Sequence, residues 1–181
     1  MRDFLFVRHG QSQANADGTI ATASTPLVEE GLEQARKTGE ELKDRKIKVI
    51  ACSPYVRAQQ TAEVIAGEFG IDIAQVRVID ELRERDLGEI SGGPKTHPTE
   101  WYYTSNDGDE GMEPCEELAE RMAKALKKID KLRREGLVLV VGHGVSGFYL
   151  QQVAKGHKTV DEFDPPSQMN NAGVAHVSYK K

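Results

Sequence analysis

Short apolar runs alternate with longer segments in which charged and apolar residues are mixed. The apolar runs have the length of buried strands and end at glycine, proline or polar residues. Strands are predicted over residues 4–7, 49–53, 76–82, 137–144 and 173–179. In the mixed segment 29–45, Leu32, Ala35 and Leu42 fall on one side, as in an amphipathic helix. Helices are predicted over residues 29–45, 57–70, 116–136 and from 144 to about 153.

This alternation of strands and helices predicts an α/β fold with a mostly parallel central sheet and helices on both faces. A chain of 181 residues, 38% of them hydrophobic, fits one domain over residues 1–181. The segment "PKTHPTEWYYTSNDGDE" breaks the pattern, because it is polar and aromatic without clear periodicity. It predicts a short cap or lid insertion at about 92–113.

Charge and apolar composition disfavour several classes of partner. The net charge of −5 argues against nucleic acid and anionic membranes. The longest apolar run, "LVLVV" from Leu137, is too short to span a bilayer, and the N-terminal run lacks the features of a signal peptide. Two cysteines, Cys52 and Cys115, do not make a disulfide framework. We therefore expect a cytoplasmic protein, in which any anion site is a local cluster of basic residues.

Three predicted strands end in residues that a strand does not need. Arg8 and His9 lead the first strand into Gly10, Arg57 follows the second strand, and His143 follows the fourth. The carboxyl ends of parallel strands meet at one edge of the sheet, near helix N-termini that favour anions. Arginine binds phosphate oxygens with its planar fork, and a neutral imidazole supplies a nucleophilic nitrogen. Their convergence predicts a phosphoryl-transfer site.

The same residues fit other kinds of site less well. No HExxH or CxxC spacing accompanies His9 and His143, and the neighbouring arginines would repel a metal cation. Four residues separate Cys52 from Arg57, whereas a cysteine-phosphatase loop has five, so Cys52 is predicted to be a buried thiol. No GxGxxG motif follows the first strand, which disfavours a dinucleotide site. We expect neither a metal nor another cofactor.

Five motifs in order resemble those of the histidine phosphatase superfamily, which includes the cofactor-dependent phosphoglycerate mutases. They are "RHGQSQAN", "TPLVEEGLEQA", "SPYVRAQQTA", "ELRERDLGEISG" and "VVGHG", and together they cover the chain except for residues near 94–110. The resemblance implies a phosphoglycerate mutase-like fold and a phosphohistidine intermediate, with His9 as the nucleophile. The residues that match the family's phosphate pocket are Arg8, Arg57, His143 and, as a less specific match, Asn15.

The resemblance also implies roles in the reaction. Attack by His9 places charge on the phosphoryl oxygens, which the two arginines and a protonated His143 would stabilise. Glu84 matches the family's proton donor and must be protonated to help an alkoxide leave. It would then take a proton from the water that hydrolyses the intermediate. The neighbouring Glu81 and Glu89 are expected to be solvated or structural.

This family core is associated with both hydrolysis and mutase-type phosphoryl transfer. The insertion here is short and offers only Lys95 and His97 as basic groups, whereas the mutases have longer basic caps. "ADGTIATASTPL" lacks the mutase-like Thr-Gly pair, and Gln11 replaces the usual glutamate after RHG. These departures favour a phosphatase that acts on a small phosphate ester, with mutase activity as the alternative.

Two further functions stay open at this stage. A protein phosphohistidine phosphatase is disfavoured because such members tend to lack a cap. A non-catalytic binding module is disfavoured because both the nucleophile His9 and the acid Glu84 are present. The aromatic residues Trp101, Tyr102 and Tyr103 either anchor the lid to the domain or cover the substrate. The sequence gives neither the substrate nor the oligomeric state.

Overall fold

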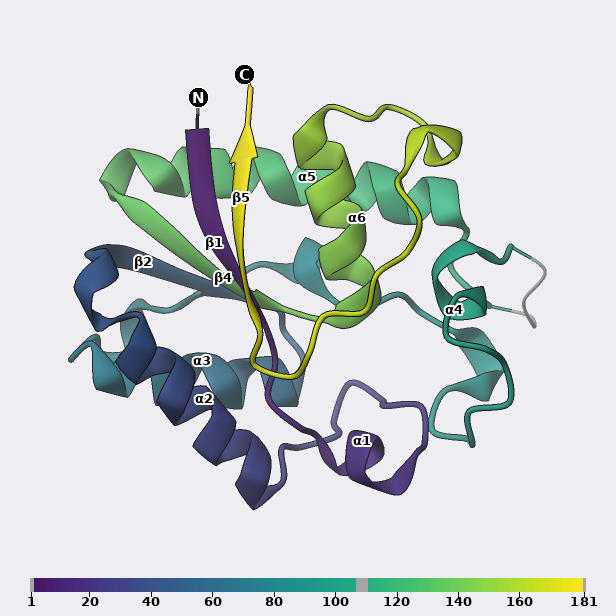
Figure 1. Ribbon diagram of the computed structural model, residues 1–181, viewed down its shortest axis with the longest axis horizontal. Helices are drawn as coiled ribbons and strands as arrows, with labels where there is room; N and C mark the ends of the chain where they lie inside the picture. The colour runs from purple at the N-terminus through teal and green to yellow at the C-terminus, as the bar shows by residue number, and fades with distance from the viewer. Residues whose placement is uncertain (1, 107–110, 181) are drawn as a thin grey trace.

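Five strands form one sheet in the structure, a computed structural model that describes residues 2–106 and 111–180 (Figure 1). The strands are β1 (Arg2–Arg8), β2 (Ile47–Cys52), β3 (Arg77–Val78), β4 (Leu137–Gly142) and β5 (Val174–Tyr179). Their order is β3-β2-β4-β1-β5, with parallel pairing except between β1 and the antiparallel β5. The predicted mostly parallel sheet is confirmed.

Helices cover both faces of this sheet, as predicted (Figure 1). On one face lie α2 (Glu29–Glu41) and α3 (Val56–Glu68), and on the other lie α5 (Cys115–Leu132) and α6 (Gly144–Lys155). The short helices α1 (Gln13–Asp17) and α4 (Trp101–Thr104) lie to the right of the sheet in Figure 1. Within the described residues, no helix is long and apolar enough to cross a membrane.

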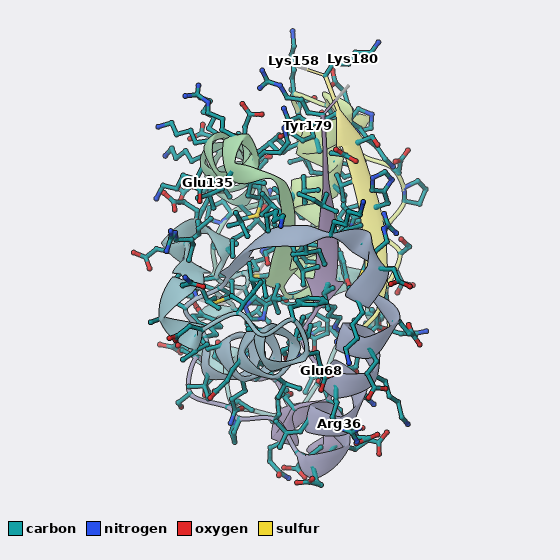
Figure 2. All side chains as sticks on the ribbon, turned by 90° about the vertical axis from the view of Figure 1, so that its left-hand side faces the viewer. Arg36, Glu68, Glu135, Lys158, Tyr179 and Lys180 are labelled. Carbon is teal, nitrogen blue, oxygen red and sulfur yellow. The ribbon has the colours of Figure 1, made fainter. Side chains whose placement is uncertain are left out.

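Alternate residues of the central strands supply the two halves of the core. In β1, Phe4 and Phe6 pack with the α5–α6 layer, whereas Leu5 and Val7 pack with the α2–α3 layer. This alternation follows from the two-residue period of a strand, and burial on both faces explains the continuous apolar runs. Figure 2 shows Arg36 of α2 at the outer surface on one side of the sheet, with Glu135, which follows α5, on the other side.

The third predicted strand is the largest error in the predicted elements. The predicted range 76–82 contains only the two-residue β3, followed by a 3-10 turn at Asp80–Leu82. β3 is an edge strand, and its Val78 is 52% exposed. Ile79 and Leu82 are buried in the α5–α6 core instead, and their three-residue spacing suits a helical turn rather than a strand. The chain therefore leaves the sheet early and begins a loop toward Glu84.

The predicted insertion at about 92–113 contains α4, which the sequence pattern did not predict. Isolated β-bridges join Pro94 to Thr19 and Met112 to Leu87. The two ends of the insertion are therefore attached to the segment after α1 and to the loop that follows Glu84. Residues 107–110 of the insertion lie outside the described part of the chain. The described part of this lid segment brings Lys95, His97, Tyr102 and Tyr103 to the cavity at the ends of the strands.

Candidate active site

The turn after β1 is formed by a close approach between two backbone segments. His9 N donates to Gly142 O at 2.9 Å, which ties the end of β1 to the end of β4. A Cβ atom on Gly10 would lie only 2.2 Å from Gly31 O at the start of α2. The Arg-His-Gly sequence is thus explained locally, because a side chain on the glycine would push β1 away from α2 and displace His9.

His9 is held as a neutral imidazole with one unprotonated ring nitrogen. Its Nδ1 donates to Gly10 O at 2.7 Å, so the lone pair lies on Nε2. Arg57 Nε donates to this Nε2 atom at 3.2 Å. Burial, followed by the charges of Arg57 and Arg8, lowers the pKa of His9 well below its usual value of about 6.5. Nε2 is therefore available as a nucleophile at neutral pH.

Two arginines flank this imidazole from different elements. Arg57, in the first turn of α3, is buried, and its Nη1 donates to Thr22 O at 2.7 Å. Its guanidinium also lies over the Tyr55 ring, 5.3 Å from the ring centre. Arg8 is buried at the end of β1 and donates from Nη1 to Met169 O. Its Nε is a buried donor without a hydrogen-bond partner among the described residues.

His143 presents a second unused donor close to the first imidazole. Its ring lies edge-on to that of His9, with the ring centres 5.3 Å apart. Its Nε2 lies 2.6 Å from Ser53 Oγ, which accepts from Tyr55 N. The serine hydroxyl finds no acceptor other than Nε2 among the described residues, so the imidazole proton lies on Nδ1. Nδ1 is buried and has no partner in the described part of the chain.

The free site favours a neutral His143 ring, and its protonation during phosphoryl transfer stays a prediction. Burial is the largest cause that lowers its pKa well below about 6.5, and the charge of Arg57 adds to it. In this tautomer the neutral His143 ring presents Nδ1–H as a donor that no described residue accepts from. The sequence did not identify Ser53, which selects this tautomer. The only signal is its position at the end of the second predicted strand.

Replacing Ser53 with alanine tests this tautomer. The Ser53→Ala variant frees His143 to place its proton on Nε2, which removes the Nδ1 donor. We expect kcat/KM for p-nitrophenyl phosphate to fall about tenfold to a hundredfold, with inhibition by inorganic phosphate weakened in parallel. Steady-state kinetics measure both quantities. Unchanged phosphate inhibition in a folded Ser53→Ala protein would contradict the assigned tautomer.

The two buried imidazoles also predict a loss of stability in acid. Because burial lowers the pKa of His9 and His143 in the folded chain, the unfolded chain binds more protons below about pH 6.5. Their contribution to the free energy of unfolding is present above that pH and is lost as the pH falls toward their folded-state pKa values. Melting temperatures in phosphate-free buffer between about pH 8 and 5 measure the effect. A His143→Gln variant should show a flatter profile, and a profile parallel to that of the wild type would contradict this origin.

Glu84 lies at the N-terminus of α6. Its Oε1 accepts from Ser146 N at 2.7 Å and from Arg85 N at 2.9 Å, and its Oε2 accepts from Val145 N at 3.1 Å. A helix N-terminus attracts a carboxylate in this way. The helix begins directly after His143, which places the carboxyl group beside the histidine pair. By contrast, Glu81 binds Lys128 at 2.6 Å and Glu89 is exposed.

Two further buried arginines support the Glu84 loop, and the sequence prediction missed both. Arg121 of α5 donates to the carbonyl oxygens of Glu81 and Arg83 and binds Glu113 at 2.5 Å. Arg85 donates to the carbonyl oxygens of Tyr102, Ser105 and Glu113. Together they hold the loop that carries Glu84 against α5 and against the lid segment. The available signal was that Arg121 falls on the buried side of its helix, three residues after Leu118.

Asn15 caps the start of α1 and also lines the cavity. Its Oδ1 accepts from Ser12 N at 3.1 Å and completes a capping box at the start of α1. Asn171 Nδ2 donates to the same oxygen at 3.1 Å and to His9 O at 3.3 Å. Asn171 was not predicted, because its link to the first motif spans most of the chain. These contacts orient Asn15 so that it lines the cavity.

The predicted site residues surround a cavity of about 160 Å³. Its walls include Arg8, His9, Asn15, Arg57 and Glu84, whereas His143 lies behind the wall, next to the lining residue Gly144. From the lid, the residues that face the cavity are Lys95, His97, Thr99, Tyr102 and Tyr103. Trp101 is not among them, since it stacks on His97 with the ring centres 3.9 Å apart. The structure thus separates an anchoring tryptophan from two cavity-lining tyrosines.

The structure also describes the residues considered for a cysteine nucleophile and for a metal site. Cys52 is 1% exposed, and burial raises the pKa of its thiol to about 12, as expected of a structural cysteine. Within residues 2–106 and 111–180, no cluster of three His, Cys, Asp or Glu side chains has the arrangement for a metal ion. The cavity chemistry therefore rests on the imidazole, the arginines and one carboxyl group.

Known proteins resemble this chain in sequence and in fold. The family model for the histidine phosphatase superfamily (branch 1) matches residues 4–181. A Bacillus subtilis protein named uncharacterized phosphatase PhoE is 34% identical over 147 residues, which cover 81% of this chain and 74% of that protein. An Enterobacter sp. (strain 638) protein named probable phosphoglycerate mutase GpmB is 34% identical over 100% of this chain and 86% of its own length.

A solved mycobacterial structure shows the same fold. It is a glucosyl-3-phosphoglycerate phosphatase described as a complex with VO3, and it superposes with a TM-score of 0.83 at 24% sequence identity. The superposition covers 97% of this chain and 90% of that one. The predicted phosphoglycerate mutase-like fold is confirmed. On the match that spans residues 4–181, the chain belongs to branch 1 of the histidine phosphatase superfamily.

Proposed function

We propose that the protein is a metal-independent phosphatase that hydrolyses a small phosphomonoester through a phosphohistidine at His9. The observation that carries this proposal is the surroundings of His9 Nε2. A neutral nucleophilic nitrogen lies 3.2 Å from Arg57 Nε and beside the His143 ring, and among the described residues Arg8 Nε and His143 Nδ1 are buried without partners. Buried polar groups usually have partners, so these donors indicate a ligand rich in acceptor oxygens. A phosphoryl group has that chemistry.

In the first step, the Nε2 lone pair of His9 attacks phosphorus and the ester P–O bond breaks. The hydrogen bond from Nδ1 to Gly10 O keeps the ring oriented while the P–N bond forms. Charge on the phosphoryl oxygens is stabilised by the guanidinium groups and by His143 Nδ1–H. Glu84 protonates the departing oxygen, which leaves as an alcohol.

In the second step, water attacks the phosphorus of the phosphohistidine. Glu84, now a carboxylate, accepts the proton from that water as the new P–O bond forms. The P–N bond breaks, its electron pair returns to His9 Nε2, and inorganic phosphate leaves. The two arginines supply the positive charge that a divalent cation supplies in metal-dependent phosphatases, so the scheme uses no metal.

A screen of phosphorylated metabolites tests this function, with phosphate release measured before and after chelator treatment. We expect turnover of p-nitrophenyl phosphate and faster turnover of at least one small alkyl phosphate, both unchanged by chelator. Activity that disappears with chelator and returns with one divalent ion would contradict the metal-independent scheme. If no compound of the screen releases phosphate, the proposed phosphatase function is contradicted.

Mutase-type transfer is the second candidate, because Lys95 and His97 both line the cavity. Such cations are able to hold a second anionic group while the phosphoryl group returns to the substrate. A relative named as a probable mutase supports the same alternative. The two activities differ in product, since a mutase yields a phosphorylated isomer and a phosphatase yields inorganic phosphate. Analysis of products from phosphoglycerates distinguishes them, and we expect phosphate.

A further inference from the structure

Tyr103 brings an unused hydroxyl group from the lid into the cavity. Tyr103 is 4% exposed, and its ring packs edge-on against that of Phe148 with the ring centres 5.5 Å apart. Its carbonyl oxygen accepts from Tyr149 Oη at 2.6 Å, which fixes the backbone of α4 at this point. Tyr103 lines the cavity, yet its hydroxyl has no hydrogen-bond partner among the described residues. The ring is thus anchored, while its polar end is left unsatisfied.

The position of this hydroxyl relates it to the phosphate pocket. A Cβ atom built on Gly144 would lie 3.3 Å from Tyr103 Oη and 3.7 Å from Arg8 Nε. The Tyr103 hydroxyl and Arg8 Nε, which is buried without a partner among the described residues, therefore lie near the same point at the first residue of α6. A helix N-terminus favours an anion at such a point.

The phenol also remains a donor under working conditions. Burial, followed by the negative charge of Glu84, raises the pKa of Tyr103 to about 12. Tyr103 therefore keeps its proton at neutral pH. The Tyr103 hydroxyl therefore faces the cavity as a donor that an oxyanion bound there is able to accept from.

We infer that Tyr103 is a further substrate-contacting residue, whose hydroxyl donates a hydrogen bond to the phosphoryl group from the lid side. The inference rests on the proposed phosphatase function for the nature of the ligand. It gives the short insertion a role in binding the phosphoryl group. The effect of replacing Tyr103 should also differ from that of replacing Glu84. A contact with the phosphoryl oxygens is needed for every ester, whatever its leaving group.

The Tyr103→Phe variant tests this role, because it removes the hydroxyl and keeps the ring against Phe148. We expect inhibition by inorganic phosphate to weaken about tenfold, and kcat/KM to fall by about the same factor for p-nitrophenyl phosphate and for an alkyl phosphate. Tyr179→Phe is the matched control. That tyrosine is also buried and donates to Asp130 at 3.0 Å, but it lies at the end of β5 near the C-terminus (Figure 2). The control should retain wild-type kinetics.

Three outcomes of this experiment are decisive. Unchanged phosphate inhibition in folded Tyr103→Phe would overturn the inference, and a loss confined to alkyl phosphates would overturn it in favour of a role in protonating the leaving group. The stabilisation of the fold by added inorganic phosphate, measured as a shift in Tm, gives a readout that does not require turnover. If the wild type binds phosphate but hydrolyses no ester, the proposed function fails, while the phosphate affinities of the two variants still decide the role of Tyr103.

Discussion

The His9→Ala variant is expected to lose phosphatase activity by about four orders of magnitude or more, because it removes the proposed nucleophile. The reason is geometric as well as chemical. No other described side chain presents a neutral nitrogen held by a backbone carbonyl on one side and by Arg57 on the other. Steady-state kcat/KM for p-nitrophenyl phosphate, together with circular dichroism to verify folding, measures the effect.

The matched control for this variant is His176→Ala. His176 is an exposed histidine on β5 that pairs with Asp3 at 2.9 Å, away from the cavity. We expect its turnover to equal that of the wild type. Turnover of folded His9→Ala within tenfold of the wild type would remove His9 from the mechanism.

The Glu84→Gln variant is expected to slow alkyl phosphates by about two to four orders of magnitude, the usual contribution of a general acid. p-Nitrophenyl phosphate should lose far less, because its leaving group departs without protonation. Glutamine also disturbs the contacts with Val145 N and Ser146 N, since its amide NH2 cannot accept from them. The ratio of the two losses is therefore more informative than either loss alone.

Glu89→Gln is the control for the acid, because Glu89 lies in the same loop, is exposed and does not line the cavity. It should leave both substrates unaffected. Equal losses for alkyl and aryl esters in Glu84→Gln would count against the proton-donor role. A selective loss in Glu89→Gln would transfer that role to Glu89.

The residues that end the parallel strands were predictable, whereas most of their supporting partners were not. Arg8, His9 and Arg57 follow from strand ends and from the rule that these ends meet at one edge. Ser53 reaches His143 and Asn171 reaches His9 across long stretches of sequence, and no local pattern reveals these contacts. The helix α4 was missed because it is a single short turn without an apolar period.

Protonation was harder to predict than position. The sequence places His143 between two glycines after a strand, but it does not show that the ring is fully buried beside two arginines. That burial lowers the pKa of His143 and favours the neutral ring in the free site. The shortened β3 has a similar cause, because burial of Ile79 and Leu82 against the α5 layer overrides a run that has strand-like composition.

Trapping the intermediate tests the central claim most directly. The protein is mixed with a labelled phosphate ester, quenched in base within one turnover, and mapped by peptide mass spectrometry. The proposed mechanism predicts a single phosphoryl group on His9, stable in base and lost in acid, and absent from His9→Ala. A phosphoryl group on Ser53 or Cys52, or burst-free turnover without any covalent intermediate, would contradict it.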